Sequence, residues 1–154
     1  MKSDKSEAQT AIHLQVAAAR DGKDPTPSWA RLFSGWVVFG ERQFLRGYVL
    51  LLPDPVVPTL NALGAQERAQ FMLDMARLGD CAAEVHQCAA YQLRHPGQSR
   101  TGTACPCHSR YADEAPALRT AHPWAYNWQA APVFDRAEYA ELSESLRREL
   151  TRMA

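Results

Sequence analysis

The chain has 154 residues, 46% of them hydrophobic and 22% charged, so it is long enough for one domain with its own core. Its 17 basic and 17 acidic side chains cancel, which argues against a surface built for nucleic acid or for anionic membranes. No apolar run is long enough to cross a bilayer, and the polar start lacks the apolar stretch of a signal peptide. We therefore expect a cytoplasmic protein whose four cysteines are thiols or metal ligands rather than disulfides.

The first half of the chain predicts a helix, two strands and a second helix. Residues 8–20 are alanine-rich with apolar residues at helical spacing, and we assign residues 1–28 to an N-terminal helix and loop ahead of a single domain over 29–154. Residues 35–39 and 47–52 are β-branched, aromatic or apolar and predict an antiparallel hairpin. Residues 67–85 carry one apolar stripe, which predicts a helix that covers a sheet.

The regular pattern fails between His86 and Ser109, where we find neither a helical stripe nor alternation. Order resumes at Arg110, and Asp135 predicts the start of a last helix, with Glu138 at capping-box spacing. A two-stranded hairpin is marginal by itself, so the missing strands must come from residues 86–111. The segment suits strands poorly, and we expect residues 86–109 to be irregular or weakly paired. We also expect poor stability, because losing two strands outweighs the roughly 5–15 kcal/mol that hold a domain together.

Several segments, taken in order, resemble the histidine-triad (HIT) family. They are residues 34–40 (SGWVVFG), 46–53 (RGYVLLLP) and 57–63 (VPTLNAL), followed by the long helix. Arg110 and Tyr111 resemble the end of the Pro-Arg-Tyr segment of that family. The resemblance implies an α+β fold in which an antiparallel sheet has helices packed on one face. It also implies a nucleotide phosphohydrolase or nucleotidyltransferase with a histidine nucleophile, a nucleotide substrate, no cofactor and a homodimer.

The chain departs from the family at its defining feature, because the His-x-His-x-His motif is absent. Reading residues 86–109 one base out of frame recovers part of it. One allowed offset reading is TSARRINYDILGNLEPALHAHVTP, which joins directly to Arg110 and contains two strand-like stretches. The frame-restored histidines occupy the positions of Ala104 and Pro106. By the resemblance, the first histidine attacks the α-phosphate and the second assists it. Because the offset reading recovers these histidines, we interpret the segment as frame-shifted. The chain as written has no histidine at the nucleophile position, and we expect it to be inactive.

Two residues are candidates for substrate binding. Arg110 suits a phosphate contact, although a surface salt bridge is an equal alternative. Trp36 suits the border of a base pocket, although an aromatic residue on a strand is more often part of the core.

Two other functions remain open. One is a non-catalytic nucleotide-binding or scaffold protein on the same fold. The other is a small zinc module, for which Cys-x-Cys-His is a weak match to the paired ligand spacing that zinc requires. The ligands of such a module would come from Cys81, His86, Cys88, His95, Cys105, Cys107 and His108.

Overall fold

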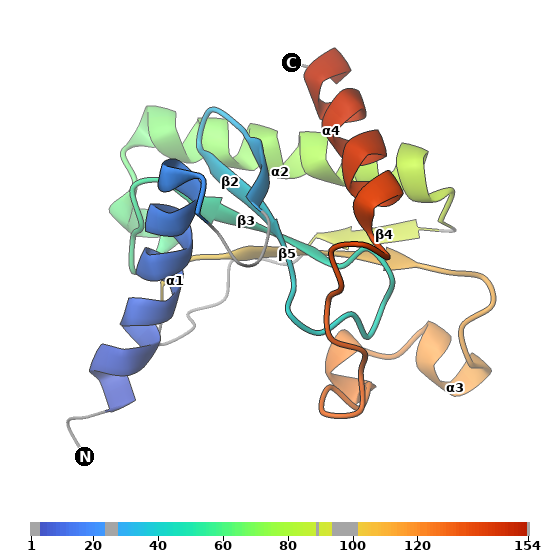
Figure 1. The fold of residues 1–154 in the computed structure, drawn as a ribbon. Coiled ribbons are helices and arrows are strands. Elements are labelled where there is room, and N and C mark those ends of the chain that lie inside the picture. The colour runs from blue at the N-terminus through green and yellow to red at the C-terminus, as the bar shows by residue number, and fades with distance from the viewer. Residues whose placement is uncertain (1–3, 24–27, 89, 94–101, 154) are drawn as a thin grey trace.

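The computed structural model describes residues 4–23, 28–88, 90–93 and 102–153, which form a five-stranded antiparallel sheet with helices on both of its faces (Figure 1). In spatial order the strands are β1-β2-β3-β5-β4, and every neighbouring pair is antiparallel. The predicted α+β class is therefore confirmed. The strands are β1 (Ser28–Arg31), β2 (Gly35–Phe39), β3 (Val49–Pro53), β4 (Ala90–Leu93) and β5 (Cys105–Arg110).

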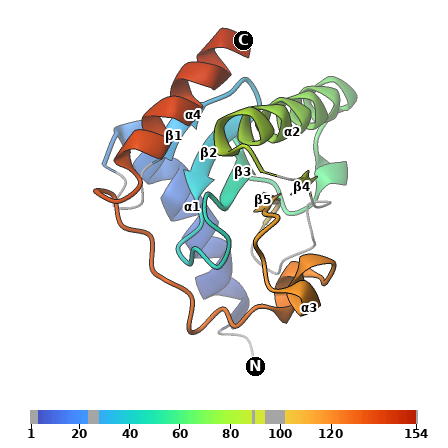
Figure 2. The same ribbon diagram turned by 90° about the vertical axis from the view of Figure 1, so that its right-hand side faces the viewer.

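The helices divide between the two sides of the sheet. Figures 1 and 2 show α2 (Ala65–His86) and α4 (Ala140–Met153) on one side, as the sequence predicts. The N-terminal helix α1 (Asp4–Asp21) and the segment that contains α3 (Pro116–Arg119) lie on the other side, so the packing on one face that the resemblance implies applies to α2 and α4. No helix in the described part of the chain is long and apolar enough to span a membrane.

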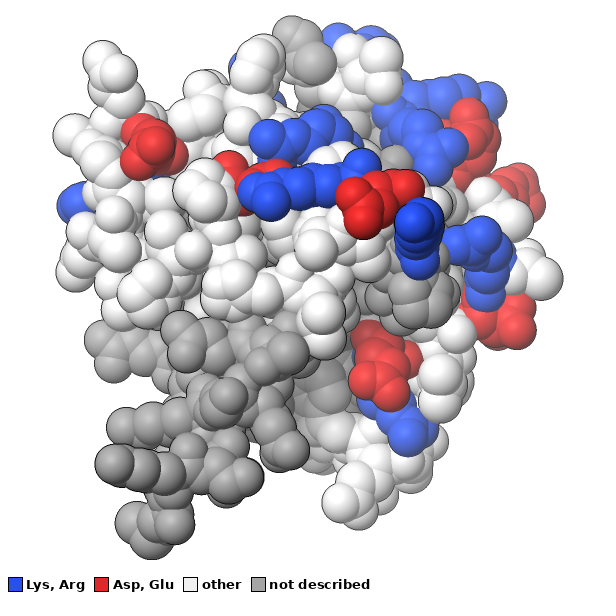
Figure 3. All heavy atoms as spheres, turned by 60° about the vertical axis from the view of Figure 1, so that its left-hand side comes forward, with Lys and Arg blue, Asp and Glu red and all other residues white. Residues whose placement is uncertain are grey.

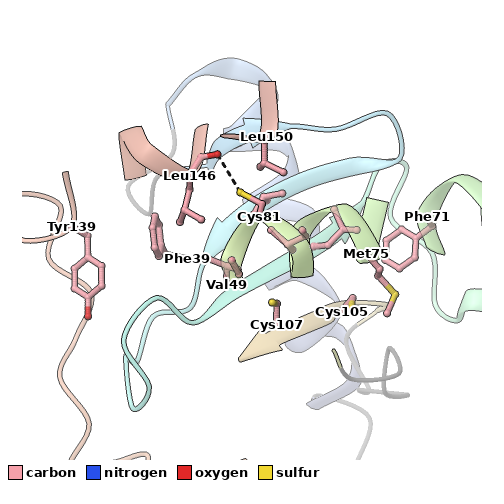
Figure 4. Close-up of a cluster of buried hydrophobic side chains, with 14 of the residues drawn as sticks. Phe39, Val49, Phe71, Met75, Cys81, Cys105, Cys107, Tyr139, Leu146 and Leu150 are labelled. Carbon is pink, nitrogen blue, oxygen red and sulfur yellow. Dashed lines mark hydrogen bonds between the residues drawn. The ribbon is translucent and has the colours of Figure 1, made fainter. Parts of the chain in front are cut away.

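Alternation along the strands builds the main core between the sheet and α2 and α4 (Figure 4). The inward side chains of β2, β3 and β5 meet the apolar stripe of α2, and Leu146 and Leu150 of α4 complete the cluster. The stripe of α2 is the one that the sequence predicts. The residues in the cluster include Val37, Phe39, Val49, Leu51, Phe71, Met75, Leu78, Cys81, Ala82, Cys105, Cys107, Leu146 and Leu150.

The prediction that residues 86–109 are irregular is wrong for β4 and β5. Strand β5 lies inside the sheet and pairs with β3 on one side and β4 on the other. Cys105 and Cys107 are fully buried, because a thiol packs as a small apolar group and fills the space beneath α2. Residues 89 and 94–101 lie outside the described residues. The low stability was expected from the loss of two strands, and both strands form. The low stability therefore stays a prediction without that support.

A buried ion pair at the end of β5 holds the segment that follows. Arg110 donates from Nε and Nη2 to the two carboxylate oxygens of Glu114, at 3.1 and 2.8 Å. Glu114 also accepts hydrogen bonds from the backbone N–H of Tyr111 and from the hydroxyl of Tyr126. The guanidinium further donates to backbone carbonyls around α3, those of Leu118, Arg119 and Ala121. One arginine thus ties α3 to the sheet.

The first prediction concerns Glu114→Gln, which keeps the shape of the side chain but removes its charge. Burial raises the pKa of Glu114, but hydrogen bonds from Arg110, Tyr126 and the backbone of Tyr111 outweigh it, so the pKa lies below its usual value. Because the pKa is lower in the folded state, the ion pair stabilises fully above the unfolded pKa of about 4.3, and this contribution is lost as the pH falls. We expect Glu114→Gln to lower the free energy of unfolding by about 3 kcal/mol at neutral pH and to flatten its decline in acid.

Urea unfolding at several pH values measures both effects. The matched control is Glu144→Gln, because Glu144 forms an exposed ion pair with Arg147 on α4. That change should alter the free energy of unfolding by about 0.5 kcal/mol or less. An equal decrease in the free energy of unfolding of the two variants at neutral pH would contradict the buried ion pair.

The second prediction uses the thiols to test the packing of β5. Cys81, Cys105 and Cys107 are fully buried, and burial raises the pKa of Cys81 to about 12 and raises the pKa of Cys107 as well. Cys88 is partly exposed. We expect one thiol of the native protein to react rapidly with an aromatic disulfide reagent, and the other three only as the protein unfolds. Cys88→Ser should remove the rapid phase; three rapid thiols would show that β5 is not packed as described.

Candidate functional site

Three alternate positions, one just before β5 and two within it, share the sheet face opposite α2. Cys105 and Cys107 belong to the main core, so Ala104, Pro106 and His108 point to the other face. Ala104 and Pro106, where the offset reading places the two histidines, are each partly exposed. We call the surface formed by Ala104, Pro106 and the neighbouring residue of β3, Leu50, the site face.

Pro106 occupies an unusual position, because proline cannot donate a hydrogen bond within a sheet. It pairs with Leu50 of β3. The pairing of β5 with β4 ends at Cys107, opposite Leu93. Among the described residues Pro106 is therefore paired on one side only, which is the arrangement in which a strand tolerates proline.

An aromatic cluster closes one end of the site face. His108 is 2% exposed, and its ring lies parallel to that of Tyr48, with the ring centroids 4.7 Å apart. Phe44 lies against both rings and packs on Trp128 at 3.8 Å and on Tyr126 at 5.6 Å. Trp128 is thus a packing residue. Enclosed in this way, the His108 imidazole is a structural group rather than an exposed nucleophile.

Helix α1 covers the other end of this side of the sheet. Ile12 and Val16 pack against Val38 and Leu52, and Ala104 lies at the border of that cluster. Beside it, Arg20 forms an ion pair with the carboxylate of Asp54. The site face therefore lies between α1 and the aromatic cluster.

Trp36 lies on the same side of the sheet, next to α1. Its indole N–H donates to the carboxylate of Asp54 at 3.0 Å, and the guanidinium of Arg31 lies 5.2 Å above its ring. The pKa of Asp54 is lowered, first by the hydrogen bond from Arg20 and then by the one from Trp36, against the effect of burial. These contacts give Trp36 a packing role, and its contact with a base stays a prediction.

Arg110 faces away from solvent, at 5% exposure. Each of its three nitrogen atoms donates to a protein group, either the carboxylate of Glu114 or a backbone carbonyl near α3. This arrangement is a buried salt bridge rather than the surface one considered above. A phosphate contact from Arg110 stays a prediction, and the geometry favours the structural role.

The residues considered for zinc do not form a metal site in the described part of the chain. Across residues 4–23, 28–88, 90–93 and 102–153, no group of three or more His, Cys, Asp or Glu side chains is placed to hold a metal ion. Cys105 and Cys107 point into the core, whereas His108 points to the opposite face. His95 lies outside the described residues.

One serine and one histidine meet at the junction of α2 and β5. The Ser109 hydroxyl lies 2.7 Å from Nδ1 of His86, and the Tyr111 hydroxyl lies 3.2 Å from the same nitrogen. A serine bound to an imidazole can act as a nucleophile, but Ser109 is fully buried and no substrate can reach it. Burial, with the charge of Arg46, lowers the pKa of His86 to about 4, so the ring is neutral near pH 7. We interpret the group as a structural anchor for the end of α2.

Charges and hollows elsewhere complete the description of the surface. Figure 3 shows basic and acidic side chains next to one another on the face that it presents, as a net charge of zero allows. A hollow of about 350 Å³ lies at the start of α2, lined by Phe33, Ser34, Asp54, Glu67 and their neighbours. A second hollow, of about 380 Å³, lies between the β1–β2 turn, α2 and α4. None of Ala104, Pro106 and Arg110 lines either of them.

The aromatic cluster around Phe44 and His108 is not predicted from the sequence. Phe44 and Tyr48 are four residues apart in a loop, while His108 and Trp128 lie far along the chain. The spacing of Phe44 and Tyr48 is a weak signal, and nothing in the sequence pairs them with the other two. Glu114 was missed for the same reason, because its significance depends on the buried guanidinium of Arg110.

Comparison with known proteins reveals a likeness in structure. No protein-family model matches the chain, and no curated protein matches its sequence. Solved histidine triad proteins do match its structure. One from Bradyrhizobium japonicum has a TM-score of 0.70 and 19% identity over 86% of this chain and 95% of that one. One from Marinobacter aquaeolei has a TM-score of 0.72 and 13% identity over 92% and 96%.

A histidine triad nucleotide-binding protein from Sulfolobus tokodaii matches with a TM-score of 0.69 and 8% identity, over 90% of this chain and 92% of that one. Identities this low establish a shared fold and leave the activity open. The agreement covers most of both chains in each comparison. The chain therefore has the fold of the histidine-triad proteins.

Proposed function

We propose that this chain is a nucleotide-binding protein of the histidine-triad type that, as written, binds nucleotides without turning them over. One observation carries the proposal: Ala104, just before β5, and Pro106, within it, are alternate, partly exposed positions on one face of the sheet. Side chains two residues apart on a strand point the same way, so two histidines there would face one substrate. One protein of the same fold is named as nucleotide-binding, which agrees with a nucleotide ligand.

The chemistry explains why the written chain should lack activity. In the mechanism implied by the resemblance, an imidazole at position 104 attacks the α-phosphorus and forms a P–N bond. The bond from phosphorus to the leaving group breaks, at an oxygen in a polyphosphate and at a nitrogen in a phosphoramidate. The leaving group takes up a proton, and water then attacks the phosphorus and releases the nucleotide and the free imidazole. Neither the methyl of Ala104 nor the ring of Pro106 can attack phosphorus or move a proton. His108 on the same face is enclosed by Tyr48 and Phe44.

The altered reading frame is a second part of the proposal. The offset reading predicts strands at residues 91–96 and 103–107, and the written chain has β4 at Ala90–Leu93 and β5 at Cys105–Arg110. Both readings therefore agree with the same sheet, and the fold does not discriminate between them. In the offset reading the chain would be an active nucleotide hydrolase or transferase. A homodimer, a cytoplasmic location and the domain boundary near residue 28 stay predictions.

The third prediction tests the positions of the histidines. Replacing residues 86–109 with TSARRINYDILGNLEPALHAHVTP should confer hydrolysis of a nucleoside phosphoramidate or a dinucleoside polyphosphate. We expect a rate at least about 100-fold above that of the written chain, the scale expected for one well-placed reacting group. Chromatographic detection of the released nucleoside monophosphate measures it.

The matched control is the same replacement with alanine retained at position 104. It should bind the nucleotide as tightly as the active variant, because it lacks only the nucleophile, and it should release no product above background. Equal product release from both proteins would sink the assignment of position 104. If the written chain fails to bind nucleoside monophosphates in calorimetry, the proposal of a binding function for it is wrong.

The fourth prediction concerns the reading frame itself. The coding DNA across residues 84–112 should permit the offset reading, with one inserted base near Val85 and one lost base near Ser109 relative to the active form. The intact mass of the protein from its natural host then distinguishes the written polypeptide from the offset one. A coding sequence whose offset codons give no histidine at positions 104 and 106 would refute the frame shift.

A further inference from the structure

Helix α1 packs on the side of the sheet that carries the site face, and its apolar side chains reach that face. Two residues of the helix, one turn apart, are buried against two strands, and we call these four residues the α1 cluster: Ile12 and Val16 of α1, Val38 of β2 and Leu52 of β3. Ala104 and Leu50 of the site face are packed against this cluster. The helix therefore extends to the edge of the site.

Strand register shows where the helix stops covering the sheet. Val38 of β2 lies opposite Leu50 of β3, and Leu50 lies opposite Pro106 of β5. Along this row Val38 is fully buried in the α1 cluster, whereas Leu50 and Pro106 are partly exposed. Helix α1 thus covers the β2 side of the row and leaves the β5 side open. Ala104 lies at the border between the covered and the open part.

The space beside Ala104 is the space that a nucleotide needs. In the proposed function, the α-phosphate lies over position 104, within reach of an imidazole there. In the structure, the methyl of Ala104 meets the α1 cluster, and a Cβ built on Gly102 would lie 3.5 Å from Cδ1 of Ile12. A phosphate over position 104 would therefore meet the apolar side chains of α1, which offer no hydrogen bond to a charged group.

The attachment of α1 to the rest of the domain is small. Among the described residues, the main core takes none from α1. Leu14, on the outer side of the helix, is 62% exposed. The ion pair of Arg20 with Asp54 adds little, because the side chain of Arg20 is 53% exposed. Figures 1 and 2 show the N-terminal end of α1 extending away from the sheet. Segments with so little buried apolar contact open at a lower cost than the whole domain.

From these contacts we infer that α1 is a cover over one edge of the nucleotide site, and that it moves away when a nucleotide binds to the site face. The inference rests on the proposed function, and it adds a regulatory element to the same site. Because the covered form does not bind, the apparent affinity falls with the fraction of molecules that are open. A change that weakens α1 without touching the site face therefore raises the affinity. A helix that only lined the site would have the opposite effect.

The fifth prediction uses an exposed alanine of α1. Ala17 is exposed, and glycine in place of alanine weakens a helix without removing a packed side chain. Ala17→Gly should tighten the binding of adenosine monophosphate about 5-fold in calorimetric titration of the complete chain. The matched control is Ala76→Gly, which makes the same change at an exposed position of α2, on the opposite side of the sheet. The control should leave the affinity unchanged.

Hydrogen exchange provides a second measurement that a purely structural role of α1 would not affect. Saturating adenosine monophosphate should speed the exchange of the backbone amides of residues 12–20, because the bound form holds α1 away from the sheet. Slower exchange of these amides would show that α1 closes on the ligand, and the inference would be overturned.

The titrations also separate this inference from the proposed function. If the unaltered chain and Ala17→Gly bind adenosine monophosphate equally, or the variant binds it more weakly, the nucleotide function stands and α1 is not a cover. If only Ala17→Gly binds it, the unaltered chain lacks the proposed binding function and the cover is supported. If neither protein binds it, both proposals are wrong.

Discussion

The alternation of side chains along β5 is the constraint on which the rest of the structure depends. The strand lies between β3 and β4, so one of its faces must meet α2 and the other must meet the opposite layer. Cys105 and Cys107 fill the first role as small buried groups, and this fixes the direction of Ala104 and Pro106. A shift of register by one residue would reverse both faces, and the burial of the cysteines opposes it. The site face is therefore a consequence of how the core is packed.

Two polar groups extend this order beyond the strand. Arg110, the last residue of β5, holds α3 and the following segment through Glu114 and several backbone carbonyls. That segment carries Tyr126 and Trp128, which pack against Phe44, a neighbour of His108. A buried guanidinium that is fully bonded is stable only because each donor finds an acceptor, so the segment is ordered as a unit. The wall of the site face is thus built from contacts distant in the sequence.

Two other carboxylates, those of Asp54 and Asp74, also join distant elements through their hydrogen bonds. Asp54 and Asp74 collect donors from elements that are distant in the chain and so join α1, the β1–β2 hairpin and α2. Arg31 lies 3.7 Å from Asp54 and over the ring of Trp36, and Arg77 lies 3.5 Å from Asp74, beside the hollow between α2 and α4. The site face and this hollow are separate products of one sheet.

The sequence by itself determined the local elements, because apolar periodicity and turn residues act over short distances. It predicted β2, most of β3, the apolar stripe of α2 and a last helix, and the order of these segments indicated the fold. It failed for β5, since the CPCHSR stretch has no strand pattern and becomes a strand only between two partners that satisfy its backbone. Tertiary structure alone decided that Arg110 is buried, that His108 is enclosed and that Arg77 lies beside the hollow between α2 and α4. Each of these depends on residues far apart in the chain, and the pattern of one segment carries no information about its partners.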